Sequence, residues 1–332
     1  MKKKLVNKLA AGVIISAMAL TGCMSAFAEE AETEPVTEAA EKEEAEEETE
    51  AYTGDASDEN TRNQDDIGEK ELLVVSFGTS FNDNRKATIG AIEDAMEAAF
   101  PEYSVRRGFT SQIIIDHVMD RDGVAIDNVE EALNRAVDNG VKTLVVQPTH
   151  LMNGFEYEEL MGTLAEFSDS FEQVAVGEPL LTSDEDFLAV ADAITAATAD
   201  YDNGKTAIVF MGHGTSHTAK ISYSQMQSQM TALGYENVFI GTVEGEPEDT
   251  SCESVIEKVS AAGYKNVILR PLMVVAGDHA NNDMAGSDDD SWLSQFKASG
   301  KFDKIDTQIN GLGEIEGIQK LYVEHTAAAM SK

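Results

Sequence analysis

Apolar runs rich in β-branched residues alternate with helical patterns along most of the chain. The first series comprises strands over 72–77, 143–147 and 174–176 and helices over 86–99, 129–139 and 184–199. The second comprises strands over 207–211, 238–241 and 267–275 and helices over 222–233 and 252–262. Strands that alternate with helices indicate parallel sheets covered by helices. The sequence therefore predicts a doubly wound α/β fold that occurs twice, with one domain over 71–203 and another over 204–332.

Two pairs of segments indicate an internal duplication. Residues 74–80 (VVSFGTS) parallel 210–216 (FMGHGTS), and 144–154 parallel 267–277 with Pro and Gly six residues apart in both copies. The overlay places Phe77 where His213 stands and Glu156 where His279 stands. If the halves face each other, His213 and His279 lie on one wall of a cleft and Glu156 lies on the other.

The N-terminal 28 residues have the pattern of a secretory signal. A lysine-rich start precedes an apolar stretch from Leu9 to Leu20, which is too short to span a bilayer. The mature protein is therefore predicted to be exported, to the periplasm or the cell surface. Two processing routes remain open: cleavage after Ala28, or lipidation of Cys23 at the lipobox-like sequence Leu-Thr-Gly-Cys.

Residues 29–70 are strongly acidic, with 18 acidic and three basic side chains and almost no large apolar ones. Such a segment is predicted to be a disordered spacer. The whole chain has a net charge of −37, which argues against nucleic acid or an anionic membrane surface as a partner. Only Cys23 and Cys252 are present, so no internal disulfide is expected in the mature protein.

His213 and His279 each follow an apolar run that is predicted to be a buried strand. Ligand chemistry in open α/β sheets collects at the carboxyl ends of strands, so these two imidazoles can converge on one cleft. Imidazole both binds first-row divalent metals and transfers protons near neutral pH. The alternatives are that His213 belongs only to a Gly-His-Gly turn and that His279 is a capping residue.

Three further side chains are candidates for the same cleft. Glu244 follows a short strand and could be a metal ligand or a solvated loop carboxylate. Glu156 opens a helix, where it could act in catalysis or only favour the helix dipole. His150 ends a strand and could line the cleft or belong to the core. The familiar motifs for ATP and dinucleotide binding are missing, so no nucleotide cofactor is expected.

The chain resembles the class II tetrapyrrole chelatases, specifically the anaerobic sirohydrochlorin cobaltochelatases of the CbiK type. The resemblance spans 71 to about 328, and its most specific stretch is 271–285 (PLMVVAGDHANNDMA). The other matching stretches are 72–80, 109–115, 153–158, 210–214 and 290–292. The family implies two flavodoxin-like halves with a cleft between them, a C-terminal helix that packs back on the first half, and lyase chemistry: ATP-independent insertion of Co²⁺ into sirohydrochlorin.

The resemblance also implies roles for individual residues. His213 and His279 would be the paired metal ligands and proton acceptors, with Glu156 in catalysis and Glu244 as a further metal ligand. From their places at strand ends, rather than from the resemblance, Phe77 and His150 are also expected to line the tetrapyrrole site. Because sirohydrochlorin carries many carboxylates, a local basic lining is also expected, with candidates Arg85, Lys86, Arg106, Arg107, Lys220 and Arg270.

Two hypotheses follow from the sequence. The first is a chelatase that inserts Co²⁺, or alternatively Fe²⁺ or Ni²⁺, into sirohydrochlorin or a related tetrapyrrole. The second is an exported carrier of metal or tetrapyrrole that has the same cleft without turnover. Both need His213 and His279, and the sequence leaves open whether the protein forms a homo-oligomer.

Overall fold

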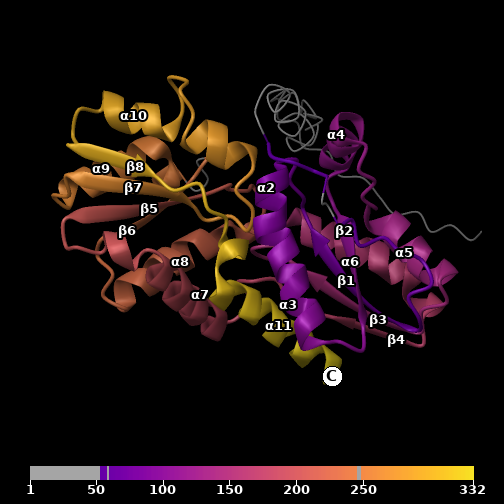
Figure 1. Cartoon of the computed structure of the whole chain (residues 1–332). Coiled ribbons are helices and arrows are strands. Elements are labelled where there is room, and N and C mark those ends of the chain that lie inside the picture. The colour runs from indigo at the N-terminus through magenta and orange to yellow at the C-terminus, as the bar shows by residue number, and fades with distance from the viewer. Residues whose placement is uncertain (1–52, 58–59, 245–247) are drawn as a thin grey trace, which may run out of the picture.

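The computed structural model describes residues 53–57, 60–244 and 248–332. These residues form two α/β lobes that lie side by side (Figure 1). The predicted signal sequence, Cys23 and the first part of the acidic spacer fall outside the described residues. Within the described part of the chain, none of the helices combines the length and the apolar character that crossing a bilayer requires.

The first lobe is built on a four-stranded parallel sheet with the order β2-β1-β3-β4. Its central strand β1 is buried at every position after the first residue, as expected for a parallel sheet covered on both faces. The strands are β1 (Lys70–Ser76), β2 (Ser104–Phe109), β3 (Thr143–Pro148) and β4 (Gln173–Val176).

The second lobe repeats this arrangement with the order β6-β5-β7-β8, again fully parallel. Its central strand β5 is buried along its whole length. The strands are β5 (Thr206–Gly212), β6 (Val238–Thr242), β7 (Asn266–Pro271) and β8 (Lys304–Thr307). The matching strand orders confirm the predicted pair of doubly wound parallel sheets.

Helices cover both sheets, and several begin at a side-chain cap. Asn128 and Ser183 each form a capping box. The side chain of the cap accepts a hydrogen bond from the backbone N–H three residues later, and the side chain of that later residue accepts one from the backbone N–H of the cap. The helices named with α are α2 (Asn82–Arg85), α3 (Ala91–Ala99), α4 (Gln112–Asp122), α5 (Val129–Asp138), α6 (Phe155–Phe167), α7 (Asp184–Ala197), α8 (Ile221–Ala232), α9 (Cys252–Ala261), α10 (Trp292–Ala298) and α11 (Glu316–Met330). The short 3₁₀ and π turns are η2 (Lys86–Gly90), η3 (Ser168–Ser170), η4 (Ala199–Tyr201), η5 (Thr218–Lys220), η6 (Glu248–Thr250), η7 (Ala280–Met284) and η8 (Leu312–Glu314).

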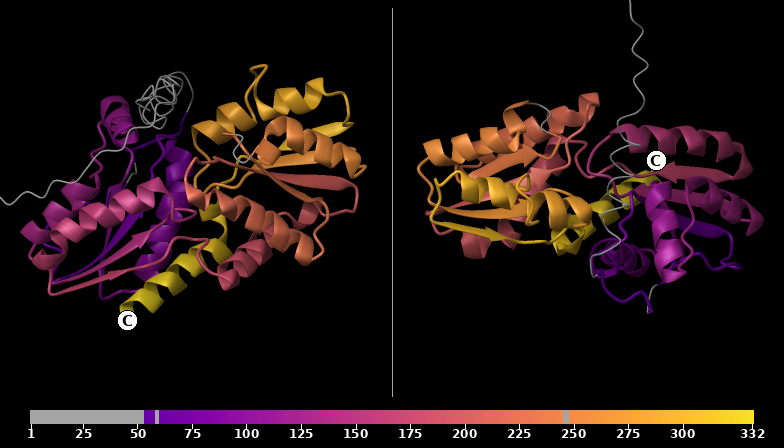
Figure 2. Two further views of the ribbon diagram at one scale, coloured as in Figure 1. Left: turned by 180° about the vertical axis from the view of Figure 1, so that it is seen from behind. Right: turned by 90° about the horizontal axis from the view of Figure 1, so that it is seen from above.

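The lobes exchange one helix each. The C-terminal helix α11 packs against α3, β3 and β4 of the first lobe, and Figure 2 shows it crossing beneath that lobe. Its Tyr322 hydroxyl donates to the Thr149 carbonyl at 2.7 Å. Conversely, α7 follows the first sheet in sequence but packs against α8 of the second lobe. The resulting shared core, which includes Ile194 and Ile318, joins the lobes into one body.

Three parts of the structure differ from the strand pattern expected from the sequence, and one of them is β8, which was not predicted. Strand β2 was not predicted, because Arg106 and Arg107 interrupt its apolar run; both are nevertheless buried. The strand expected over 267–275 ends at Pro271. Strand β5 ends at Gly212, and the Leu272 N–H still donates to the Met211 carbonyl at 2.6 Å. Residues 272–275 lie beyond the end of β7 and line a cavity.

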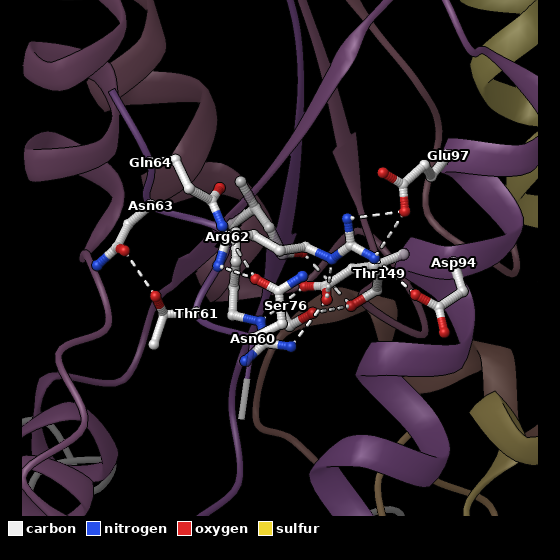
Figure 3. A network of polar contacts seen from close by, with 12 residues as sticks. Asn60, Thr61, Arg62, Asn63, Gln64, Ser76, Asp94, Glu97 and Thr149 are labelled. Carbon is white, nitrogen blue, oxygen red and sulfur yellow. Dashed lines mark hydrogen bonds and ion pairs between the residues drawn. The ribbon is translucent and has the colours of Figure 1, made fainter. Parts of the chain in front are cut away.

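The end of the predicted spacer is also different from the expectation. Residues 60–69 lie along the first lobe, and Arg62 is buried among the acidic side chains of α3 (Figure 3). The Arg62 guanidinium contacts Glu93 at 3.1 Å and Asp94 at 2.6 Å. The prediction of disorder was therefore wrong for residues 60–69. The Arg62 guanidinium pairs with the buried Glu93 carboxylate and so fixes this part of the segment to the first lobe.

Candidate metal centre between the lobes

A cavity of about 380 Å³ lies between the two lobes. Its wall includes residues that come within two positions of the ends of the central strands of both sheets: Phe77 after β1, His150 after β3 and His213 after β5. The carboxyl ends of the two sheets therefore face one shared space. This is the position at which parallel α/β sheets bind ligands.

His213 and His279 meet in this cavity although 66 residues separate them in the sequence. Their ring centroids lie 4.5 Å apart and their planes are inclined at 74°. His213 lies in the loop after β5, and His279 lies in the helical turn that begins after β7 and leads into η7. The convergence expected from the sequence is therefore present in the structure.

A glycine next to His213 brings a carboxylate to the same place. Gly214 has a φ of +94°, and a Cβ at this position would lie 2.6 Å from the Cβ of Glu244. The Glu244 backbone N–H donates to the His213 carbonyl at 2.8 Å. Only glycine accommodates both this backbone conformation and this approach, so the Gly-His-Gly sequence places Glu244 beside His213.

Hydrogen bonds determine which ring nitrogen of each histidine carries a proton. Nδ1 of His213 lies 2.8 Å from the Gly214 carbonyl oxygen, and Nδ1 of His279 lies 2.6 Å from Asp283 Oδ2. Both oxygens can only accept, so both Nδ1 atoms donate. In the neutral ring the lone pair is then on Nε2, which is the form that binds a metal ion.

The first lobe contributes a different set of groups to the cavity. Glu156 lies in the first turn of α6 and lines the wall contributed by that lobe, and Phe77 adds an aromatic side chain to the same wall. His150 also lines the cavity, but neither of its ring nitrogens is accessible to solvent or has a hydrogen-bond partner. Burial lowers the pKa of His150 to about 4, against the opposing charge of Glu156, so its imidazole is neutral at physiological pH.

The chain matches a known family over nearly all of its described length. The family model described as cobalt chelatase (CbiK) matches residues 70–331. This chain belongs to the cobalt chelatase (CbiK) family. The identification agrees with the geometry, because a chelatase needs a site for a metal ion beside a space for its macrocycle.

Similar proteins support the same assignment. The chain is 36% identical over 263 residues to the sirohydrochlorin cobaltochelatase of Salmonella typhimurium, covering 79% of this chain and 97% of that protein. It is 31% identical over 265 residues to the sirohydrochlorin cobaltochelatase CbiKC of Nitratidesulfovibrio vulgaris, covering 79% and 91%. Among solved structures, SirB from Bacillus subtilis with Fe³⁺ has a TM-score of 0.53 at 14% identity, covering 80% of this chain and 98% of that one; this likeness concerns the fold.

The basic residues proposed for substrate binding are not at the cavity of this CbiK-family chain. Arg85 is fully buried and donates to the Thr79 carbonyl at 2.8 Å, while Lys86 is exposed on η2. Arg107 pairs with buried Glu93 through two contacts of 2.7 and 2.8 Å. Their assignment to tetrapyrrole binding does not agree with the structure: Arg85 and Arg107 are bonded inside the first lobe, and exposed Lys86 does not line the cavity. A charge pattern in the sequence does not show whether a basic side chain is already paired or which surface it lies on. Among the described residues that line the cavity, none is lysine or arginine.

The sequence did not indicate Tyr223 as a site residue. Tyr223, on α8, lines the cavity and its hydroxyl accepts from the Gly214 backbone N–H at 3.1 Å. His217, one turn beyond His213, was expected to orient His213 or to contact the ligand; instead it contacts Glu158 of the first lobe at 3.2 Å and the Phe155 ring at a centroid distance of 4.8 Å. The sequence could not predict these partners because they lie on the other lobe.

Asp283 was missed as well, although the sequence did contain a signal for it. It stands four residues after His279, a spacing that brings two side chains together on one face of a helical turn. Ligand atoms of Asp278, His279 and Asp283 lie within 4.8 Å of one another. The second lobe therefore surrounds His279 with carboxylates.

Proposed function

We propose that this protein inserts a divalent metal ion, with Co²⁺ as its principal substrate, into sirohydrochlorin or a related tetrapyrrole without using ATP. The observation that carries the proposal is the pair of imidazole rings, His213 and His279, 4.5 Å apart in the cavity between the lobes. Family membership supports the reaction class, and the two sirohydrochlorin cobaltochelatases support the substrate class.

The reaction exchanges one ion for two protons. A divalent ion enters the macrocycle as two pyrrole N–H bonds break, so the products are the metallated ring and two protons. Nε2 of His213 and of His279, together with the Glu244 carboxylate, would hold the ion before transfer, since imidazole and carboxylate suit first-row divalent metals. As the ion leaves these ligands, the same nitrogens become available to accept protons.

The first lobe would complete this reaction from the opposite wall. Glu156 supplies a carboxylate there, which can accept a pyrrole proton within hydrogen-bond reach. Phe77 and the neutral ring of His150 provide a surface of low polarity for a flat macrocycle. The ion would thus approach from the second lobe, and the ring would be supported by the first.

A direct assay tests the proposal. Purified protein is incubated anaerobically with sirohydrochlorin and Co²⁺, without nucleotide, and the absorbance change on insertion is followed together with proton release. The expected result is acceleration over the protein-free mixture with two protons released per ring. Saturable binding without acceleration would instead support the exported carrier. Parallel reactions with Fe²⁺ and Ni²⁺ rank the metals.

Export belongs to the same proposal, because the N-terminal 28 residues have a signal pattern. Mass measurement of the mature protein distinguishes the two processing routes. A chain that begins at Glu29 indicates simple cleavage, and a lipidated Cys23 indicates a membrane anchor. An intact Met1 would contradict export.

A further inference from the structure

The two histidines of the site are oriented by acceptors of different charge. His213 donates its Nδ1–H to the neutral carbonyl of Gly214 at 2.8 Å. His279 donates its Nδ1–H to the carboxylate of Asp283 at 2.6 Å. A hydrogen bond to a charged acceptor is shorter and about twice as strong as one between neutral groups. The two metal ligands are therefore not equivalent.

The turn that carries Asp283 is held in place by its own side chains. His279 precedes the π turn η7, whose Ala280 and Met284 are buried. The Asn281 side chain donates to the Gly277 carbonyl at 2.7 Å, and Asn282 donates to Asp278 at 2.5 Å. The position of the carboxylate behind His279 is thus built into the turn.

We propose that Asp283 is a positioning residue for His279. By accepting the Nδ1–H, it keeps the ring in the tautomer whose Nε2 lone pair binds the ion, and its negative charge makes that nitrogen a stronger ligand. Carboxylates placed behind a metal-binding histidine have this effect generally. This inference rests on the proposed function, in which His279 is a metal ligand.

The difference between the two acceptors makes the pair of ligands unequal. His279, backed by a carboxylate, is the stronger ligand of the ion, and His213, backed by a carbonyl, is the weaker one. Asp283 therefore contributes to the affinity of the site through His279.

Co²⁺ binding without tetrapyrrole tests the role of Asp283. We measure the Kd by titration, with the visible absorption bands of bound Co²⁺ as the spectroscopic signature. Asp283→Ala should weaken binding about 10- to 100-fold. Asp283→Asn should weaken it less, because the amide oxygen can still accept the Nδ1–H. Asp289→Asn is the matched control, since Asp289 is exposed in the same segment and its change removes the same charge.

The tautomer provides a second readout that a merely structural role would not move. Nitrogen NMR of the metal-free protein should show His279 protonated at Nδ1 in the parent protein and as a mixture of tautomers in Asp283→Ala. The double variant His279→Ala/Asp283→Ala should bind Co²⁺ no more weakly than His279→Ala. An additional loss in the double variant would show that Asp283 binds the ion directly and would overturn the positioning role.

The outcomes separate this inference from the proposed function. If His279→Ala binds Co²⁺ as the parent does, the metal site itself is wrong. If His279→Ala loses binding while Asp283→Ala keeps the parent Kd and the parent tautomer, only the role of Asp283 is wrong. Thermal unfolding of each variant checks that the fold is kept.

Discussion

The strands β1 and β5 occupy the same place in their sheets and end in the same kind of turn, but they deliver different side chains to the cleft. Phe77 precedes Gly78 with a φ of +111°, and His213 precedes Gly214 with a φ of +94°. The backbone of the duplicated turn is thus retained, while the residue before the glycine is a phenylalanine in the first lobe and a histidine in the second. The second lobe supplies both imidazole rings that we propose as metal ligands, and the first supplies Phe77, His150 and Glu156 on the opposite wall.

The two lobes also differ in the side chains that their strands bury away from the cavity. In the first lobe Glu71 and Arg107 are buried on β1 and β2. At the same register in the second lobe stand Ala207 and Ile240, which are also buried. The first lobe therefore buries charge away from the cavity, where Arg107 and Arg62 meet Glu93. Duplication preserved the pairing of strands but not the chemistry of either face.

The largest expected effect comes from the second lobe. His279→Ala should lower the insertion rate about 10²- to 10⁴-fold, the usual contribution of a group that transfers protons. The fold should remain, because the side chain is partly exposed and lies on the cavity wall. His117→Ala, on α4 outside the cavity lining, is the control. Comparable losses in both variants would end the assignment of the chemistry to the second lobe.

A smaller effect, on stability, is expected from the buried charges of the first lobe. Arg107→Ala should lower the free energy of unfolding by about 3 kcal/mol, because it leaves the buried Glu93 carboxylate with a poorer set of partners. Urea denaturation measures the change. Adding Glu93→Gln should recover part of the loss, since it removes the buried charge. A double variant no more stable than Arg107→Ala would contradict this account.

The same lobe should respond to pH through Glu71. Burial raises the pKa of this carboxyl to about 7, opposed by Arg106 and Arg135 and reinforced by Asp127. Because the folded state binds the proton more tightly than the unfolded state, the stabilisation from protonated Glu71 is full below about pH 4.5 and is lost as pH rises through about 7.

Glu71→Gln should therefore remove a pH-dependent loss of at most about 2–3 kcal/mol between pH 5 and pH 8. Urea denaturation of parent and variant at both pH values isolates this contribution as a difference. The exposed Glu172→Gln should leave the pH dependence as it is. An equal pH response of the parent protein and Glu71→Gln would show that Glu71 is already ionised at pH 5.

The smallest effect concerns the apolar wall. Phe77→Ala should raise the KM for the tetrapyrrole about tenfold, equivalent to about 1.4 kcal/mol of lost contact. The Kd for Co²⁺ should stay unchanged, because the proposed metal ligands belong to the other lobe. Phe302→Ala, which alters the packing of Phe296 in the second lobe, should change neither constant. Weaker Co²⁺ binding in Phe77→Ala would contradict the proposal that the second lobe alone binds the metal and the first supports the tetrapyrrole.

Much of the fold could be read from the sequence because its signals are local. The buried central strands β1 and β5 are continuous apolar runs, and the Gly-Thr-Ser repeat marks the duplicated turns. Strand β2 escaped this reasoning, since Arg106 and Arg107 make it polar in sequence while Glu93 and the Gln64 carbonyl satisfy them inside the lobe. A local pattern cannot include partners that arrive from elsewhere in the chain.

The site divides in the same way. The sequence predicted that His213, His279 and Glu156 line one cleft, and they do line one cavity, because strand ends in parallel sheets gather at one edge. The sequence alone thus determined which groups are available and at which ends of which strands they stand. Only the tertiary structure decided that Arg85 and Arg107 are hydrogen-bonded inside the first lobe, and that α7 and α11 each pack against the lobe to which they do not belong in sequence. It also decided that Asp283 accepts a hydrogen bond from one imidazole while a backbone carbonyl accepts one from the other. These outcomes depend on distances between segments far apart in sequence, and those distances are set by packing.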